Sequence, residues 1–143
     1  ASMLALNDFG AELSDLEAVK SVTDVTGFGL LGHLSELCEG SGVKATIRYS
    51  EVPKLPGLER YLDLGTMPGG TTRNFESYGH KVSELSDTWK AVLCDPQTSG
   101  GLLVAVEPSG RDAFLEAAKE RGLELDCFGT LSEAGDSLIT VTE

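Results

Sequence analysis

Residues 23–34 read Thr23-Asp24-Val25-Thr26-Gly27-Phe28-Gly29-Leu30-Leu31-Gly32-His33-Leu34. This order of residue types predicts the end of a strand, a tight glycine turn and the start of a helix. The free backbone N–H groups at a helix N-terminus can bind a phosphate. The carboxylate of Asp24 would repel a phosphate held there unless a divalent cation lay between them. We therefore expect Asp24 to be a metal ligand, with the metal bridging to a nucleotide phosphate.

Other interpretations of this stretch remain open. Asp24 can instead cap the helix, and residue chemistry alone favours capping and metal binding equally. The segment 27–32 also has the form GxGxxG, and Glu51 stands about where the ribose ligand of a dinucleotide-binding fold would lie. Two features count against a dinucleotide: the chain lacks a regular strand–helix alternation, and Asp24 would meet an unmetallated pyrophosphate. The glycines can also serve the close packing of a helix on a sheet.

Length and composition narrow the class of protein. A chain of 143 residues fits one domain, and its 11 basic and 23 acidic residues give a net charge of −12. This charge argues against binding to nucleic acid or to an anionic membrane surface. Solubility is the simplest explanation of the charge, which also fits an affinity for cations. The apolar runs are all shorter than the ~18 residues of a membrane span, and no signal peptide is visible. Three cysteines without CxxC spacing predict buried thiols of a reducing, cytoplasmic compartment rather than disulfides or zinc.

The periodicity of apolar residues predicts the elements. Helices are expected over residues 28–39, 57–64, 86–94 and 109–121, and strands over 17–24, 43–49, 102–106, 123–131 and 137–142. The strand at 102–106 is continuously apolar, which is typical of burial on both faces. Residues 7–10 are expected to interrupt any helix near the start, and 67–74, 75–85 and 95–101 are expected to be loops or irregular. Two β-α-β passages, 17–49 and 102–131, then predict an α+β fold in which helices pack against a mixed β-sheet.

Local signals refine these elements and identify further candidate groups. Gly40 and Gly42 are expected to stop the helix at 28–39, and Ser109 with Asp112 resembles a capping box. Backbone N–H groups, hydroxyls and a guanidinium at 69–74 and 98–101 can hold an anion, or these loops can be plain surface turns. A structural role is expected for His33 and His80, which lack metal-ligand spacing. The absence of GxxxxGK[ST] argues against a Walker-type ATPase.

Three stretches together carry a family resemblance. DVTGFGLLGHL at 24–34, PGGTTRN at 68–74 and DPQTSGGLL at 95–103, in this order and spacing, resemble selenophosphate synthetase (selenide, water dikinase). That family lies within the wider superfamily of aminoimidazole ribonucleotide synthetase. MLALN at 3–7 and PKLPGLE at 53–59 also fit. The resemblance covers residues 3–143 and corresponds only to the C-terminal domain of that enzyme, and Ala1-Ser2 is expected to be a cloning scar.

The resemblance implies a function and a division of labour. The complete enzyme would be a Mg²⁺-dependent homodimer that makes selenophosphate from selenide, ATP and water and releases AMP and phosphate. Its N-terminal domain, absent here, would carry the reactive Cys or selenocysteine, a Lys, further metal-binding Asp residues and the main dimer interface. In this chain Asp24 matches the metal-ligating Asp, Thr26 and Gly27 would border the triphosphate, and Arg73, Asn74 and the segment Thr98–Gly101, which includes Ser99, would face the cleft.

The same comparison with the family pattern sets two limits. No catalytic residue is expected in this chain, and the isolated chain is expected to be inactive. The rival interpretations are another ATP-using enzyme of the same superfamily and a stand-alone nucleotide-binding or interaction module.

Overall fold

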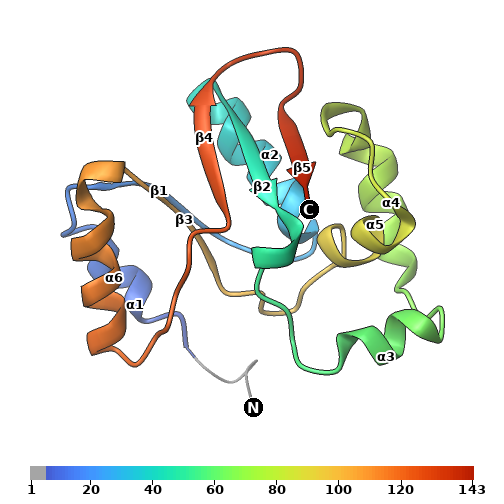
Figure 1. Ribbon diagram of the computed structural model, residues 1–143, viewed down its shortest axis with the longest axis horizontal. Coiled ribbons are helices and arrows are strands. Elements are labelled where there is room, and N and C mark those ends of the chain that lie inside the picture. Colours follow the sequence, from blue (N-terminus) through green and yellow to red (C-terminus); the bar gives the residue numbers. More distant parts are fainter. Residues whose placement is uncertain (1–5) are drawn as a thin grey trace.

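Two sheets organise the strands of the chain. The computed structural model describes residues 6–143 (Figure 1). β1 (Val19–Asp24) pairs antiparallel with β3 (Leu102–Val106) in a two-stranded ribbon. β2 (Val43–Arg48) is the centre of a second sheet, with β4 (Gly129–Glu133) antiparallel on one side and β5 (Ile139–Thr142) parallel on the other. The predicted α+β class with a mixed sheet is confirmed.

The strand pairing differs from the prediction in one respect. β1 and β2 lie in different sheets, and so do β3 and β4. The predicted β-α-β passages at 17–49 and 102–131 are therefore wrong, because the two strands of each passage do not share a sheet. Most elements could be predicted from local patterns, whereas the long-range pairing of β1 with β3 could not.

Helices surround these sheets. They are α1 (Phe9–Leu13), α2 (Gly29–Ser41), α3 (Leu58–Asp63), α4 (Gly69–Tyr78), α5 (Asp87–Leu93) and α6 (Arg111–Glu120), with short 3₁₀ turns at Tyr49–Glu51, Gly79–Lys81 and Pro108–Gly110. In Figure 1, α1 and α6 lie at one side of the molecule, α4 and α5 at the other, and α2 behind the three-stranded sheet. Among residues 6–143, no helix combines the length and the apolar character needed to cross a membrane.

Two apolar clusters lie on either side of the β1–β3 ribbon. The main core packs α2 beneath the three-stranded sheet, with Leu31, Ile47 and Ile139 among its fully buried side chains. The smaller cluster joins α1 to α6 through Phe9, Leu13, Phe114 and Ala118. Side chains of β3 contribute alternately: Leu103 to the main core, and Leu102 and Val104 to the smaller cluster. The ribbon therefore connects the two halves of the domain.

α2 and β2 follow directly from their sequences. Leu31, Leu34 and Cys38 are buried at three- and four-residue spacing, which is the apolar stripe of an amphipathic helix. Gly42, with a left-handed φ of 66°, ends α2. Gly40 lies inside the helix, so the prediction that it helps to stop α2 is wrong. β2 buries the alternate residues Ala45 and Ile47, as expected for a strand with one covered face.

α4 was not predicted, because its buried face is polar. The expected loop at 67–74 and the irregular stretch from residue 75 onward are a helix from Gly69 to Tyr78. Its buried residues are Thr71, Asn74 and Tyr78, spaced by three and four, so no apolar periodicity marks it. Two glycines in its first turn further lower the helix propensity. Tertiary packing overrides both signals.

Smaller differences complete the comparison. Helix α1 begins at Phe9, within the segment 7–10 that was expected to interrupt a helix, and residues 1–5 lie outside the described residues. Strand β3 is not buried on both faces, since only Leu103 is fully covered. The N-cap of α6 is Gly110 without a side-chain bond, so Ser109 and Asp112 form no capping box. The strand expected over 123–131 begins only at Gly129.

Candidate functional site

The three motifs that carry the family resemblance converge in space. Asn74, on α4, donates from Nδ2 to the carbonyl oxygens of Gly27 and Cys94, both at 2.9 Å. Its amide thus joins the glycine turn after β1 to the start of the 95–101 loop. That loop also lies along the turn, since the Gly100 amide donates to the Val25 carbonyl and the Val25 amide donates to the Gly101 carbonyl, both at 2.9 Å.

Glycines make this close approach possible. A Cβ on Gly29, whose φ is +70°, would lie 2.8 Å from the backbone carbon of Cys94. A Cβ on Gly70 would lie 2.8 Å from a ring carbon of Pro96, and one on Gly100 would lie 2.7 Å from the Val25 oxygen. Side chains at these three positions would therefore push the segments apart. Close packing therefore explains the glycine at position 29, although its neighbour is the Cys94–Asp95 backbone and not a sheet as expected.

We call the place where residues 24–34, 68–74 and 95–103 meet the junction. Gly27 differs from the other glycines there. A Cβ at this position would meet nothing within 4 Å, and its φ is not positive. Neither packing nor backbone conformation within the described chain requires a glycine there. The residue is exposed beside Asp24 and leaves room for a ligand to approach the backbone.

Asp24 is the last residue of β1, paired with Leu102, and its side chain is exposed. Within the part of the chain that the structure describes, its carboxylate takes part in no hydrogen bond or ion pair. The N-cap of α2 is Phe28, without a side-chain cap bond, so the alternative that Asp24 caps this helix is wrong. The carboxylate is thus available to a group from outside the chain.

Backbone donors lie next to this carboxylate. No acceptor among residues 6–143 takes the amide hydrogens of Thr26, Gly27 or Phe28, which precede the first turn of α2. Gly27 and Phe28 are exposed, and the Phe28 side chain is 54% exposed. A run of unpaired N–H groups at the start of a 13-residue helix is suited to an anion.

The hydroxyl of Thr26 is engaged inside the domain. Thr26 Oγ1 lies 3.2 Å from Nε2 of His33, and Nδ1 of His33 lies 3.2 Å from Oε2 of Glu36. His33 is buried, and its ring lies 5.8 Å from that of Phe28. These contacts agree with the structural role expected for His33. His80 lies exposed in the 3₁₀ turn after α4.

Asp95 is a site residue that the sequence did not single out. Burial raises the pKa of its carboxyl, while Thr71 and Gln97 favour the charged form and oppose that shift. Gln97 Nε2 donates to Asp95 Oδ2 at 2.6 Å. Thr71 Oγ1 is buried and lacks a partner in good hydrogen-bond geometry within the described residues, although it lies close enough to affect Asp95. Asp95, Gln97 and Thr71 together stabilise the 95–101 loop against α4. Their proximity arises from the tertiary structure and is not visible in the sequence.

The remaining predicted site residues divide into buried and exposed ones. Asn74 is buried, and its amide is used in the contacts above, so it does not face a cleft. Arg73, Thr98 and Ser99 are exposed, and the guanidinium of Arg73 forms no ion pair with any described residue. Thr26 and Gly27 follow Asp24 in the turn that leads to α2.

Two hollows lie away from this junction. One, of about 290 Å³, is lined by residues of α1 and β1 that include Leu13 and Val19. The other, of about 360 Å³, lies between Tyr49, Lys54 and α3. Neither includes Asp24 among its lining residues. Among the described residues, no group of three or more His, Cys, Asp or Glu side chains is placed to hold a metal.

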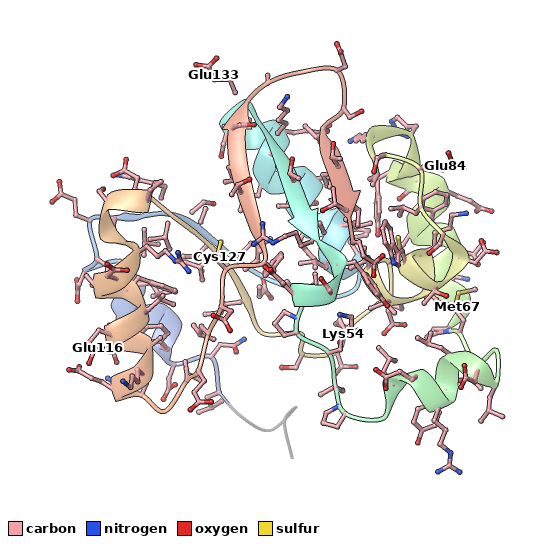
Figure 2. The ribbon with its side chains drawn as sticks, viewed as in Figure 1. Lys54, Met67, Glu84, Glu116, Cys127 and Glu133 are labelled. Carbon is pink, nitrogen blue, oxygen red and sulfur yellow. The ribbon has the colours of Figure 1, made fainter. Side chains whose placement is uncertain are left out.

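The cysteines differ from the prediction in one case. Cys38 and Cys94 are buried free thiols, as expected. Cys127 is exposed on the segment that leads from α6 to β4 (Figure 2), so its predicted burial is wrong.

Comparison with known proteins shows the family to which the chain belongs. The model of the AIR synthase related protein, C-terminal domain, matches residues 2–141. The chain belongs to this family. The AIR synthase related domain is 55% identical over 139 residues to "Selenide, water dikinase" of Pseudomonas putida, covering 97% of this chain and 40% of that protein. It is 51% identical over 132 residues to the protein of the same name from Cronobacter sakazakii, covering 92% of this chain and 38% of that one.

These relatives confirm the resemblance drawn from the three motifs. The AIR synthase related domain spans about two fifths of the length of the curated relatives it matches. A solved structure, E. coli HypE, "a hydrogenase maturation protein", is similar with a TM-score of 0.56 and 21% identity, over 90% of this chain and 34% of that one. At this identity the likeness concerns the fold alone.

Proposed function

We propose that this AIR synthase related domain supplies a Mg²⁺ ligand and part of the ATP-site wall to an enzyme that makes selenophosphate from selenide, ATP and water. The proposal rests on the turn between β1 and α2, which begins at Asp24 and is called the Asp24 turn. There the exposed carboxylate of Asp24, which has no partner among residues 6–143, is followed by backbone amides that are unpaired within the same range and by an unobstructed glycine. The names of the relatives support the choice of reaction.

The electrostatics of the turn favour a metal-bound phosphate. The amides of Thr26, Gly27 and Phe28 suit a phosphate oxygen, whereas the Asp24 carboxylate opposes one. A divalent cation between carboxylate and phosphate removes that conflict. Mg²⁺ is commonly held by one or two protein carboxylates, with phosphate oxygens and water completing its octahedron. Asp24 therefore fits as one ligand among several.

The remaining ligands and the chemistry belong to another part of the full-length protein. We assign residues 3–143 to the C-terminal domain and the reactive Cys or selenocysteine, the Lys and the other metal-binding Asp residues to an N-terminal domain. The metal would screen the charge of the polyphosphate and orient it for transfer. On this assignment the isolated chain is inactive and the complete enzyme works in the cytoplasm as a homodimer.

The decisive test replaces Asp24 by Asn in the full-length enzyme. Selenide-dependent release of AMP is expected to fall by at least about a hundredfold, because a neutral amide is a poor Mg²⁺ ligand. Asp15→Asn is the matched control, since Asp15 is also exposed and its carboxylate has no partner among the described residues. Both variants should unfold at the temperature of the unmodified enzyme.

Two results would contradict the proposal. Near-normal turnover by Asp24→Asn would remove the ligand role. ATP consumption by the full-length protein that is independent of selenide would assign the domain to another ATP-using enzyme of the superfamily.

A further inference from the structure

Three successive carbonyl oxygens of the Asp24 turn accept hydrogen bonds from the rest of the domain. The donors lie on the 95–101 loop and on α4, and the bonds are Gly100 N to Val25 O at 2.9 Å, Gln97 N to Thr26 O at 3.1 Å and Asn74 Nδ2 to Gly27 O at 2.9 Å. The two segments that carry the other motifs therefore hold the turn by its carbonyl groups.

The direction of each carbonyl fixes the direction of the next amide hydrogen. A peptide unit joins the C=O of one residue to the N–H of the next, and in the trans form these two bonds point in opposite directions. The peptide bonds of the turn are trans. The N–H groups of Thr26, Gly27 and Phe28 therefore point away from the partners of the carbonyls. This direction explains why no acceptor among residues 6–143 takes these three hydrogens.

Asn74 is the one of these three donors that acts through its side chain. Its side chain is buried, and Nδ2 donates to the carbonyls of Gly27 and Cys94, both at 2.9 Å. Carbonyl oxygens only accept hydrogen bonds, so the nitrogen of the side-chain amide must face both of them. The two hydrogens of Nδ2 are thus both used, and one of them holds the peptide unit between Gly27 and Phe28.

This peptide unit has little else to fix its orientation. Gly27 is exposed, and a Cβ there would meet no atom within 4 Å. A glycine also permits more backbone conformations than any other residue. Without the bond from Asn74, the unit could rotate about the Gly27 backbone, and the Phe28 amide hydrogen would leave its outward position.

We propose that Asn74 is a positioning residue that holds the Phe28 amide hydrogen outward for a phosphate oxygen of ATP. The side chain acts through the peptide unit between Gly27 and Phe28 and itself stays buried beneath the turn. The inference rests on the proposed function for the presence of ATP at this turn. It adds the residue that orients a phosphate-binding amide.

The test compares two hydrogen bonds to backbone groups in the full-length enzyme. Asn74→Ala should raise the KM for ATP by about three- to tenfold, the effect of weakening one hydrogen bond. The kcat should change by less than about twofold, because the amide contacts the phosphate equally before and during the reaction. Both parameters are measured from selenide-dependent release of AMP.

Ser83→Ala is the matched control. Ser83 Oγ accepts from the Val141 amide at 3.0 Å, at strand β5 and outside the junction. Its loss also leaves a backbone group without its side-chain partner. Ser83→Ala should therefore lower the unfolding temperature, as Asn74→Ala does, but leave the KM for ATP unchanged.

Hydrogen exchange gives a second measurement that does not depend on a variant that folds. In the unmodified full-length enzyme, ATP without selenide should slow exchange of the Thr26, Gly27 and Phe28 amides by about tenfold or more. The Gly29 amide already donates to the Thr26 carbonyl at 2.9 Å, so it is the internal control and should change less. In Asn74→Ala the slowing should be weaker at Phe28 than at Thr26.

Three results would overturn the inference. They are an unchanged KM for ATP in Asn74→Ala, an equal rise of this KM in Ser83→Ala, and exchange of the Phe28 amide that ATP does not slow. Failure of the proposed function would appear separately, as near-normal turnover by Asp24→Asn.

Discussion

The hydroxyl of Tyr78 donates a hydrogen bond of 2.6 Å to the carbonyl oxygen of Phe28. Tyr78 ends α4, and Phe28 is the residue before α2. The ring of Tyr78 also lies over Gly32, where a Cβ would approach it to 3.0 Å. A helix that the sequence did not predict thus holds the turn on which the proposed function depends.

Tyr78→Phe should destabilise the fold by about 1–3 kcal/mol, because it leaves the Phe28 carbonyl without its donor while preserving the ring. Urea unfolding measures the change. Tyr61→Phe is the control, since the Tyr61 side chain is 58% exposed, and it should shift stability by less than about 0.5 kcal/mol. Equal effects of the two substitutions would show that the Tyr78 bond contributes nothing to the fold.

Gly29→Ala and Gly42→Ala separate backbone strain from close packing. Both glycines have left-handed φ values, +70° and +66°, so each substitution should cost about 1 kcal/mol in strain. Only Gly29 would also drive a Cβ to 2.8 Å from the Cys94 backbone, whereas Gly42 faces open space. Gly29→Ala should therefore cost at least about 2 kcal/mol more in unfolding free energy. A similar loss in both variants would argue against a tight junction.

Gly27→Ala should leave stability nearly unchanged, because its Cβ would meet no atom within 4 Å. In the full-length enzyme it should nevertheless raise the KM for ATP, since the new methyl would occupy the space in which the phosphates approach the backbone. Gly40→Ala, also unobstructed but on the exposed side of α2, is the matched control. An unchanged KM in Gly27→Ala would place the phosphates elsewhere.

Stability should fall at alkaline pH because buried thiols resist ionisation. Burial, with a smaller effect of the Glu39 charge, raises the pKa of Cys38 from 9.0 to about 11. Burial also raises the pKa values of Cys94 and Tyr78. A pKa that is higher in the folded state gives stability that is complete below the unfolded value and is lost as pH rises. For Cys38 the loss falls between pH 9 and about 11.

The slope of stability against pH checks this assignment. Each such group contributes at most about 1.4 kcal/mol per pH unit within its window. Cys38→Ala should make the decline between pH 9 and 11 shallower by about that amount, although its stability at neutral pH is lower. Cys127→Ala removes an exposed thiol and serves as the control. Parallel curves for the Cys38 variant and the unmodified chain would contradict the prediction.

Local patterns predicted most elements but not how they meet. The alternation in 43–49 and the apolar stripe from Leu31 to Cys38 mark β2 and α2, because each element buries one face against the same core. Nothing local indicates that β1 pairs with β3, since such pairing depends on contacts far apart in the sequence. The α4 helix was missed for a related reason: Thr71, Asn74 and Tyr78 bury polar atoms whose partners lie on other segments.

The candidate site shows the same division. Asp24 was predicted as a metal ligand from the charge of its carboxylate beside an expected helix start, whereas Gly27 became a candidate only through the family resemblance. The contact of Thr26, in the turn before α2, with His33, one turn into α2, was not indicated by the spacing alone. Asp95 gave no signal, because its burial arises only when α4 packs against the 95–101 loop.

The ribbon of β1 and β3 ends on the pair Asp24–Leu102. The side chain of Leu102 packs against the cluster that joins α1 to α6. Apolar packing therefore holds the strand position opposite Asp24, the proposed metal ligand. Phe114, on the buried face of α6, belongs to the same cluster, although it lies ninety residues after Asp24 in the chain. Substitutions at Phe114 are consequently expected to shift Leu102 and, with it, the paired Asp24. If Asp24 holds Mg²⁺ as proposed, we expect substitutions in the α1–α6 half of the domain to change the affinity for that cation without contacting the nucleotide.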